Sequence, residues 1–417
     1  MSKRNHIPAI AIMFILFFMI AFVTGLQNPL GVIVKFQFGL TNGGSQLGNF
    51  VNFLAYAIMG LPAGYLLRKY GYKISSLVAT VIGFAGVFLI FLSGSLQTPN
   101  FWIYLLGAFV SGFAMCMLNA VVNPMLNNIG GGGNKGNQML QLGSSFNSIA
   151  ATVAPVFLGW LMGREAGHTI KDADPAFYIA MGIFVLAFVV ILFTNIPEPD
   201  RDLSLKPRLL PKKGQTSYLS FRHFKLGALA IFLYVGVEIS IANSANLYLI
   251  HGVNLHPFKA GVLVSFFWLF MFIGRMIGGY YGARFAGKDM LSFASFGTMA
   301  LIVMSIFTPD KFVLSFGRYG TDIPVNVVFL ILCGFFTSVM WGAIFNLAVE
   351  GLGKYTAEAS GFFMVMVCGG GVIPILQMYV ADVFGYQQSL WLLFACLVYI
   401  LYYASSGYKN VNRKIKV

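Results

Sequence analysis

The chain has 417 residues, of which 58% are hydrophobic and only 10% are charged. Soluble proteins carry about 25% charged residues, so this composition excludes a soluble globular protein and indicates a surface that faces lipid. The net charge of +14 does not indicate a nucleic-acid partner. The basic residues cluster at the ends of apolar runs, as the orientation of membrane helices requires.

Twelve apolar stretches follow one another along the chain, and a membrane-spanning helix needs about 20 residues. Backbone polar groups are satisfied in lipid only by helices or closed barrels, and these stretches are too long and evenly apolar for barrel strands. We predict an all-α membrane protein. Its expected helices are at residues 7–35, 46–68, 74–94, 101–129, 138–162, 176–194, 225–251, 258–282, 288–307, 324–352, 357–384 and 387–406.

The positions of Lys and Arg predict the orientation. With the N-terminus in the cytoplasm, 21 of the 27 basic residues fall on the cytoplasmic side, in agreement with the positive-inside rule. Both termini are then cytoplasmic, in a bacterial inner membrane. We predict a six-helix bundle over residues 1–196, a proline-rich cytoplasmic linker over 197–224, a second six-helix bundle over 225–406 and a cytoplasmic tail over 407–417.

The two predicted bundles resemble each other in sequence. Gly64–Lys73 and Gly279–Lys288 both place glycines and basic residues in a short cytoplasmic loop. Pro155 in the fifth helix has a counterpart, Pro374, in the eleventh. Paired repeats are typical of secondary transporters, whose solute site lies near the bilayer midplane between the repeats. The sequence therefore predicts a transporter of a small solute.

Several short motifs occur in a fixed order along the predicted helices. They are Pro62–Gly64, Gly71–Lys73, Asn123–Pro124, Phe146–Ser148, Tyr234–Glu238, Phe272–Arg275, and Gly369–Gly371 with Pro374. Taken together they resemble the major facilitator superfamily and, within it, the fucose–galactose–glucose family of sugar symporters. The resemblance covers nearly the whole chain and implies the major facilitator fold, with import of a hexose or related monosaccharide.

Several residues depart from the pattern of that family, including Gln141 and Ser144 in the fifth helix, where the pattern has asparagine and glutamine. Asn28 stands where the first helix usually carries an aspartate that takes up a proton, and Asn119 stands where the fucose symporter has a glutamate. Coupling to a proton, coupling to sodium and facilitated diffusion without coupling therefore all remain open. An exporter of hydrophobic drugs or lipids on the same fold is a further alternative.

Glu238 lies in the middle of the seventh predicted helix. A charged residue at the bilayer centre costs about 2.5–3.5 kcal/mol and normally faces the bundle interior. Glu238 either binds the substrate and carries a coupling proton or cation, or it is a structural acid that holds helices together. At about 100° per residue, Asn246 lies about 80° around the helix from Glu238 and can share its face.

Amides, carboxylates and aromatic rings are the groups that recognise uncharged sugars. The same amides also hold helices together, and tryptophans also anchor helices at the membrane interface, so each candidate has a structural alternative. The predicted substrate-binding residues are Gln27, Asn28, Asn119, Gln141, Asn147, Glu238, Asn246, Trp268, Trp341 and Gln377.

Four cations at the cytoplasmic helix ends, Arg68, Lys69, Arg275 and Arg284, are predicted gate residues that can meet acids such as Glu350 and Glu358. The run Gly130–Gly133 lacks the spacing of a phosphate-binding loop. No acid–base pair or metal-ligand spacing indicates an enzyme. We therefore expect no enzymatic activity, no metal and no cofactor. The expected partners are a monosaccharide, a coupling proton or sodium ion, and membrane lipid.

Overall fold

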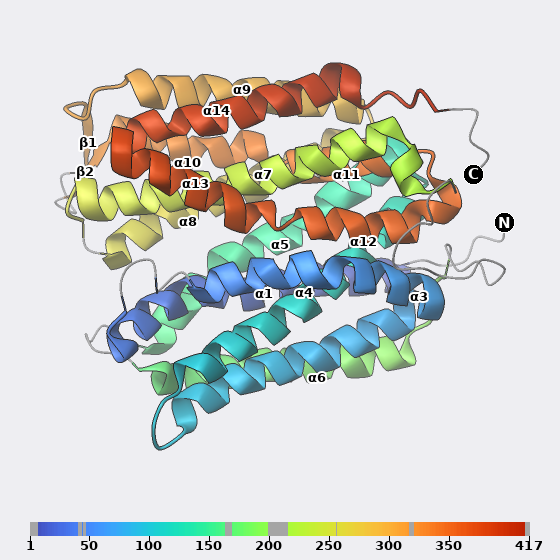
Figure 1. The fold of residues 1–417 in the computed structure, drawn as a ribbon, viewed down its shortest axis with the longest axis horizontal. Helices are drawn as coiled ribbons and strands as arrows, with labels where there is room; N and C mark the ends of the chain where they lie inside the picture. The colour runs from blue at the N-terminus through green and yellow to red at the C-terminus, as the bar shows by residue number, and fades with distance from the viewer. Residues whose placement is uncertain are drawn as a thin grey trace.

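The computed structural model describes residues 7–40, 44, 47–162, 169–198, 216–255, 257–316 and 321–412. The chain forms a bundle of long helices that run back and forth between two ends (Figure 1). The helices are α1 (Ile7–Phe38), α3 (Leu47–Ser95), α4 (Phe101–Ile129), α5 (Gly133–Met162), α6 (Asp174–Phe193), α7 (Arg222–Leu247), α8 (Pro257–Tyr281), α9 (Gly287–Phe307), α10 (Val325–Thr337), α11 (Met340–Val349), α12 (Thr356–Met366), α13 (Gly369–Phe384) and α14 (Tyr386–Tyr402).

The described helices make twelve membrane crossings, as predicted. Ten stretches of the described residues are long and apolar enough to span a bilayer. One of them, α3, contains two crossings, because Gly71 interrupts the helix with φ 85° and ψ 179°. The remaining crossing is α5, which is less apolar because it carries more Asn, Gln and Ser residues than the others. The α10–α11 and α12–α13 pairs each make one crossing.

The turn within α3 is stabilised by an acid from the end of the first half. The Glu198 carboxylate accepts hydrogen bonds from the backbone N–H groups of Tyr72 (2.6 Å) and Lys73 (3.0 Å). An anion is favoured at this position, because the first N–H groups of a helix have no partner within the helix. A side chain at Gly71 would collide with that carboxylate, and its positive φ favours glycine.

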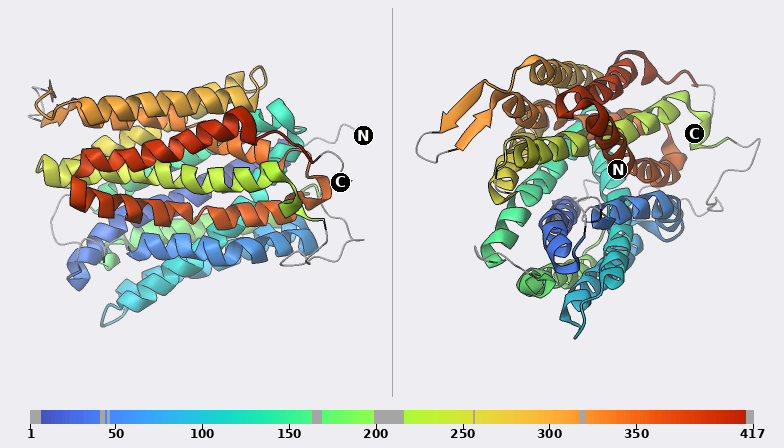
Figure 2. Two further views of the ribbon diagram at one scale, coloured as in Figure 1. Left: turned by 45° about the horizontal axis from the view of Figure 1, so that its top comes forward. Right: turned by 60° about the vertical axis from the view of Figure 1, so that its left-hand side comes forward.

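The helices divide into two groups that follow the chain order. Helices α1–α6 pack mainly on one another, as do α7–α14, and the two groups lie on opposite sides of the bundle (Figure 2). The first turn of α1 and the last turn of α14 lie at the same end of the bundle (Figure 1). We call this the terminal end and the opposite one the far end.

The two halves meet mainly through α3 against α12 and α5 against α8. Glycines bring the helices close. A Cβ atom at Gly64 would lie 2.9 Å from the Cα atom of Gly361, and one at Gly279 would lie 2.5 Å from Leu142. These residues belong to the parts of the four helices that lie nearer the terminal end. Small residues at such crossings let membrane helices pack at short distance.

Some local features differ from the prediction. The tenth crossing is broken between α10 and α11, and the eleventh between α12 and α13, where continuous helices were expected. The α7 helix begins at Arg222, inside the predicted linker. The strands β1 (Val313–Phe316) and β2 (Thr321–Pro324) form an antiparallel pair at the far end, with Val313 opposite Pro324. Linker residues 199–215 and tail residues 413–417 lie outside the described residues.

Candidate functional site

The break between α10 and α11 exposes backbone carbonyls that a continuous helix would satisfy internally. Three successive carbonyls there accept hydrogen bonds from side chains of three other helices. The Tyr234 hydroxyl donates to Thr337 O at 3.2 Å, Arg275 Nε to Ser338 O at 3.2 Å, and Gln141 Nε2 to Val339 O at 2.8 Å. Gln141 comes from the first half, so the break is a point at which the two halves are joined.

Arg275 lies within α8 rather than in the loop that follows it, and only 4% of its surface is exposed. Besides Ser338, it binds the opposite half. Its Nη1 group donates to Ser144 O at 3.0 Å and to Ser148 Oγ at 2.6 Å, both on α5. The predicted gate residue Arg275 therefore connects α5, α8 and the helix break.

Glu238 is half-buried on α7. Its carboxyl group is a hydrogen-bond partner of the Tyr234 side chain, one helical turn earlier, and the charge of Arg275 acts on it. Arg275 directs the hydrogen bonds given above to neutral oxygens, and the two residues form no direct ion pair. Glu238, Tyr234 and Arg275 thus form a connected group beside the helix break.

Two amide contacts also join the halves. Trp341 Nε1 on α11 donates to Asn123 Oδ1 on α4 at 2.9 Å, and its ring lies edge-on to that of Tyr234 with centroids 6.5 Å apart. Nearer the terminal end, Asn346 Nδ2 donates to Asn127 Oδ1 at 2.7 Å. The predicted stacking residue Trp341 therefore lies between the two halves and next to the Glu238 group.

The contact between α3 and α12 holds an ion pair. Arg68 Nη1 lies 2.5 Å from Glu358 Oε1, with side-chain exposures of 4% and 15%. Glu358 is one of the two acids that the sequence analysis predicted as partners of the gate cations. Burial, followed by the charge of Glu358, raises the pKa of Tyr218 to about 12, so this neighbouring phenol stays neutral.

Several other predicted residues lie within one half. Asn119 Nδ2 donates to the Tyr56 hydroxyl at 3.0 Å, between α4 and α3. Asn147 Nδ2 donates to Phe17 O at 3.4 Å, between α5 and α1. Gln377 is fully buried, and its Nε2 group donates to Ser244 Oγ at 2.7 Å.

The remaining predicted residues vary in exposure. Asn246 and Trp268 are half-buried, and the Oδ1 atom of Asn246 is buried without a hydrogen-bond partner. Lys69 and Arg284 are exposed at the terminal end, and Lys69 lies over the ring of Tyr70, 5.0 Å from its centroid. The side chains of Gln27 and Asn28 lie outside the described part of the structure.

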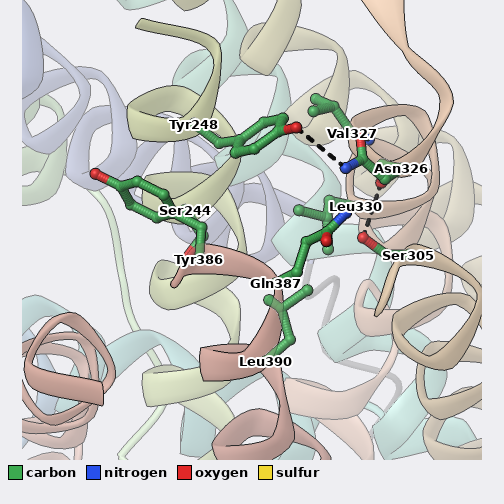
Figure 3. A pocket seen from close by; sticks show the side chains of 9 residues that line it. All are labelled: Ser244, Tyr248, Ser305, Asn326, Val327, Leu330, Tyr386, Gln387 and Leu390. Atoms are coloured by element: carbon green, nitrogen blue, oxygen red, sulfur yellow. Dashed lines mark hydrogen bonds between the residues drawn. The ribbon is translucent and has the colours of Figure 1, made fainter. Parts of the chain in front are cut away.

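Ser244, the hydrogen-bond partner of Gln377, lines a very small cavity near the far end of the second half (Figure 3). The cavity has a volume of about 10 Å³, which fits one water molecule. Asn326 Nδ2 donates to Asp310 Oδ1 at 2.8 Å and lies 3.5 Å from the Tyr248 hydroxyl at its edge. This space is too small for a solute. Its lining residues are Ser244, Tyr248, Ser305, Asn326, Val327, Leu330, Tyr386, Gln387 and Leu390.

A larger cavity, of about 480 Å³, lies at the terminal end between the α4–α5 and α11–α12 connections. The hydrogen-bonded pair of Asn127 and Asn346 forms part of its wall. The other lining residues come from both halves and include Gly131–Gly133, Glu350 and Thr356. The cavity lies on the terminal side of the contacts that join the halves.

The sequence analysis did not assign a role to Tyr234, Ser144 or Ser148. Tyr234 was visible as part of the Tyr234–Glu238 motif, and its spacing of four residues places it on the same helix face as Glu238. The two serines gave no such signal, because a serine within an apolar helix usually bonds to its own backbone.

Residues 13–375 match the family model described as the Major Facilitator Superfamily. The chain belongs to this superfamily. As a major facilitator protein it is a multi-pass membrane transporter and not an enzyme, and the predicted resemblance to the fucose–galactose–glucose family is confirmed by its relatives.

The relatives span nearly the full chain. It is 30% identical to the putative glucose/galactose transporter of Helicobacter pylori, over 98% of this chain and 99% of the relative. It is 29% identical to the glucose/galactose transporter of Brucella abortus, with 98% and 96% covered. The L-fucose–proton symporter of Escherichia coli is 26% identical, with 92% and 89% covered.

Solved structures agree with the fold. The crystal structure of the Escherichia coli fucose:proton symporter superimposes with a TM-score of 0.77 at 22% identity, covering 96% of this chain and 98% of that one. At this level of identity the match establishes the major facilitator fold.

Proposed function

We propose that this transporter imports a hexose, with glucose and galactose as the first candidates, by alternating access and coupled to a proton. The relatives named as glucose/galactose transporters cover nearly the entire chain. The single observation that carries the proposal is the group formed by Glu238, Tyr234 and Arg275 next to the contacts between the halves.

The sugar site is proposed at the half-buried polar and aromatic side chains of this region. Because a carboxylate is strongly disfavoured in lipid, the exposed part of Glu238 is expected to face a polar space between the halves. Amide and carboxylate groups would hydrogen-bond the sugar hydroxyls, and an indole ring would cover a C–H face. The proposed ligands are Asn147, Glu238, Asn246, Trp268 and Trp341.

The most buried candidates are assigned supporting roles. Asn119 and Gln377 bind partners within their own halves, so they are proposed to hold the helices that carry the site. Gln141 binds across the halves and is proposed to act in the gate with Arg68 and Arg275.

The terminal end is proposed to face the cytoplasm of a bacterium, with the protein in its inner membrane. The excess of Lys and Arg at that end supports this orientation, and the named relatives cited above are bacterial. Because the contacts between the halves lie mainly toward the terminal end, this is then an outward-facing conformation. The halves are proposed to rock against each other as two bodies.

Glu238 is proposed to carry the coupling proton, because Asn28 replaces the aspartate of the family pattern and Asn119 the glutamate of the fucose symporter. A protonated Glu238 can donate a hydrogen bond to a sugar oxygen, whereas an ionised one can only accept. Sugar binding and proton binding would then favour each other at a single side chain.

Uptake of radiolabelled glucose, galactose, fucose and mannose into proteoliposomes tests this function. A proton gradient, inside alkaline, should drive accumulation of at least one hexose, and a sodium gradient should not. Accumulation with sodium alone, or equilibration without accumulation, would contradict proton coupling. The absence of any hexose uptake would contradict the sugar assignment.

A further inference from the structure

Arg275 is a buried cation that is satisfied by neutral oxygens. It donates to three acceptors, Ser338 O, Ser144 O and Ser148 Oγ, and the Tyr234 side chain is a further hydrogen-bond partner. Two of these three acceptors belong to α5, in the opposite half. The guanidinium group therefore holds the α5–α8 contact closed while retaining a positive charge that no bonded carboxylate neutralises.

Glu238 lies one helical turn after Tyr234 on α7, and Tyr234 and Arg275 donate to neighbouring carbonyls of the helix break, Thr337 O and Ser338 O. The carboxylate is therefore close enough for its charge to interact with that of Arg275. Tyr234 lies between them, as partner of Glu238 and donor to Thr337 O. The other helices that pack on α7 carry Glu358, which pairs with Arg68, on α12, and Tyr379 and Asp382 on α13; α14 carries Tyr386, Cys396, Tyr399 and Tyr402. On α5 the only ionisable group is Lys135, in the first turn, and α10 and α11 contribute only Cys333.

We propose that Arg275 is the positioning residue that transmits the charge of Glu238 to the α5–α8 contact. When Glu238 is protonated, the guanidinium group remains on α5 and the terminal end stays closed. When Glu238 is ionised, a charge-assisted bond to the carboxylate is stronger than bonds to neutral oxygens. Arg275 then moves toward α7 and releases Ser144 and Ser148.

The α8 helix packs tightly on the break between α10 and α11, so a movement of Arg275 also affects other contacts of that break. A Cβ atom at Gly274 would lie 2.2 Å from Ser338 Oγ, and one at Gly278 would lie 2.6 Å from the Val339 side chain. Because no space separates α8 from the break, a shift of Arg275 also disturbs the Val339 carbonyl that Gln141 binds from the other half.

This arrangement would prevent a proton leak. A carrier with a protonated Glu238 and no sugar would be held closed at the terminal end, so the proton could not reach the other side alone. An ionised, empty carrier would be free to change conformation. The inference rests on the proposed function of Glu238 in coupling, but it makes a prediction that needs no sugar.

Spin-label distances between Asn134 and Ala283 provide the test. Both positions are exposed, at the terminal ends of α5 and α8, and the four native cysteines would be replaced by alanine. In sugar-free nanodiscs, the ratio of the closed to the open distance should fall as the pH rises. Glu238→Gln should stay closed at every pH.

Arg275→Gln should lose the pH dependence although Glu238 is intact, with the closed-to-open ratio lowered about tenfold, which corresponds to about 1.4 kcal/mol. Arg275→Lys keeps the charge but not the planar fork, so it should keep the pH dependence at a lower closed fraction. Lys259→Gln, which removes an exposed charge from the same helix, should behave as the wild type.

The inference is overturned if Glu238→Gln or Arg275→Gln retains the pH dependence of the wild type. It is also overturned if Arg275→Lys loses that dependence, because the arginine would then be only structural. If Arg275→Gln does not fold, Glu238→Gln and Arg275→Lys still decide the outcome. Failure of sugar uptake would leave these distances unaffected, so the two proposals fail separately.

Discussion

The two contacts that close the terminal end differ in their chemistry. The contact of α3 with α12 combines closely packed glycines with the ion pair of Arg68 and Glu358. The contact of α5 with α8 also has glycines, but its cation, Arg275, binds serine and backbone oxygens. The sequences of the two halves are related, yet only the first contact contains an acid.

Because of this difference, the two contacts are expected to respond differently to the charge of Glu238. A cation that is already paired with an acid gains little from a second acid, so the α3–α12 contact is insensitive to Glu238. Arg275 is hydrogen-bonded to neutral oxygens, so the charge of Glu238 can still act on it. We interpret the α3–α12 contact as one that stabilises the closed terminal end whatever the charge of Glu238. The α5–α8 contact is the one whose strength depends on that charge.

Breaking the ion pair should have the largest effect. Arg68→Ala removes the cation that pairs with the largely buried Glu358 carboxylate, and loss of one member of a buried pair costs about 3–5 kcal/mol. The terminal end should open and the rate of hexose accumulation should fall to near background in proteoliposomes. The double variant Arg68→Met/Glu358→Met, which leaves no unpaired charge, should recover part of the rate. An equal loss in both variants would argue against a role for charge.

Overpacking of the same contact should have the next largest effect. At Gly361, a Cβ atom would lie 2.6 Å from the Cα atom of Gly64. Gly361→Leu should therefore cost about 1–3 kcal/mol in the closed state and slow transport severalfold. The matched control is Gly182→Leu, since nothing lies within 4 Å of that position. Equal transport by both variants would show that close approach at Gly361 is dispensable.

Trp341→Phe tests whether the contact between α4 and α11 serves sugar binding or the gate. The substitution removes the bond from Nε1 to the buried Asn123 oxygen and keeps most of the aromatic surface. Leaving an acceptor unsatisfied costs about 1–3 kcal/mol, so the half-saturating sugar concentration should rise several fold. A matched fall in maximal rate with unchanged half-saturation would instead assign Trp341 to the gate.

The smallest effect is expected for the exposed cations. Lys69→Gln and Arg284→Gln remove charges that are solvated at the terminal end, and such substitutions usually change stability by less than about 0.5 kcal/mol. Uptake should remain close to that of the wild type. A large loss would mean that these residues bind a partner in another conformation of the transporter.

Much of the fold was predictable because its signals are local. The lengths of the apolar stretches predicted the membrane crossings. Gly71 indicated the turn inside α3, where the backbone requires a positive φ. Glu358 was a reasonable partner for Arg68 because acids are rare in this chain. Glu238 stood out for the same reason, as a charge within an apolar helix.

The break between α10 and α11 was not predictable from local sequence. Thr337–Val339 contains neither glycine nor proline, so nothing in the segment itself ends a helix. The break is stabilised by donors from Tyr234, Arg275 and Gln141, which are distant in sequence. Gln141 was for this reason predicted as a sugar ligand, although its amide is used between the halves.

The most direct test of the proposed coupling compares accumulation with exchange in Glu238→Gln. With a proton gradient, the wild type should concentrate labelled hexose inside proteoliposomes, whereas Glu238→Gln should not. Exchange of labelled for unlabelled sugar, which needs no net proton movement, should persist in the variant. Accumulation by Glu238→Gln at the wild-type level would contradict the assignment of Glu238 as the coupling acid.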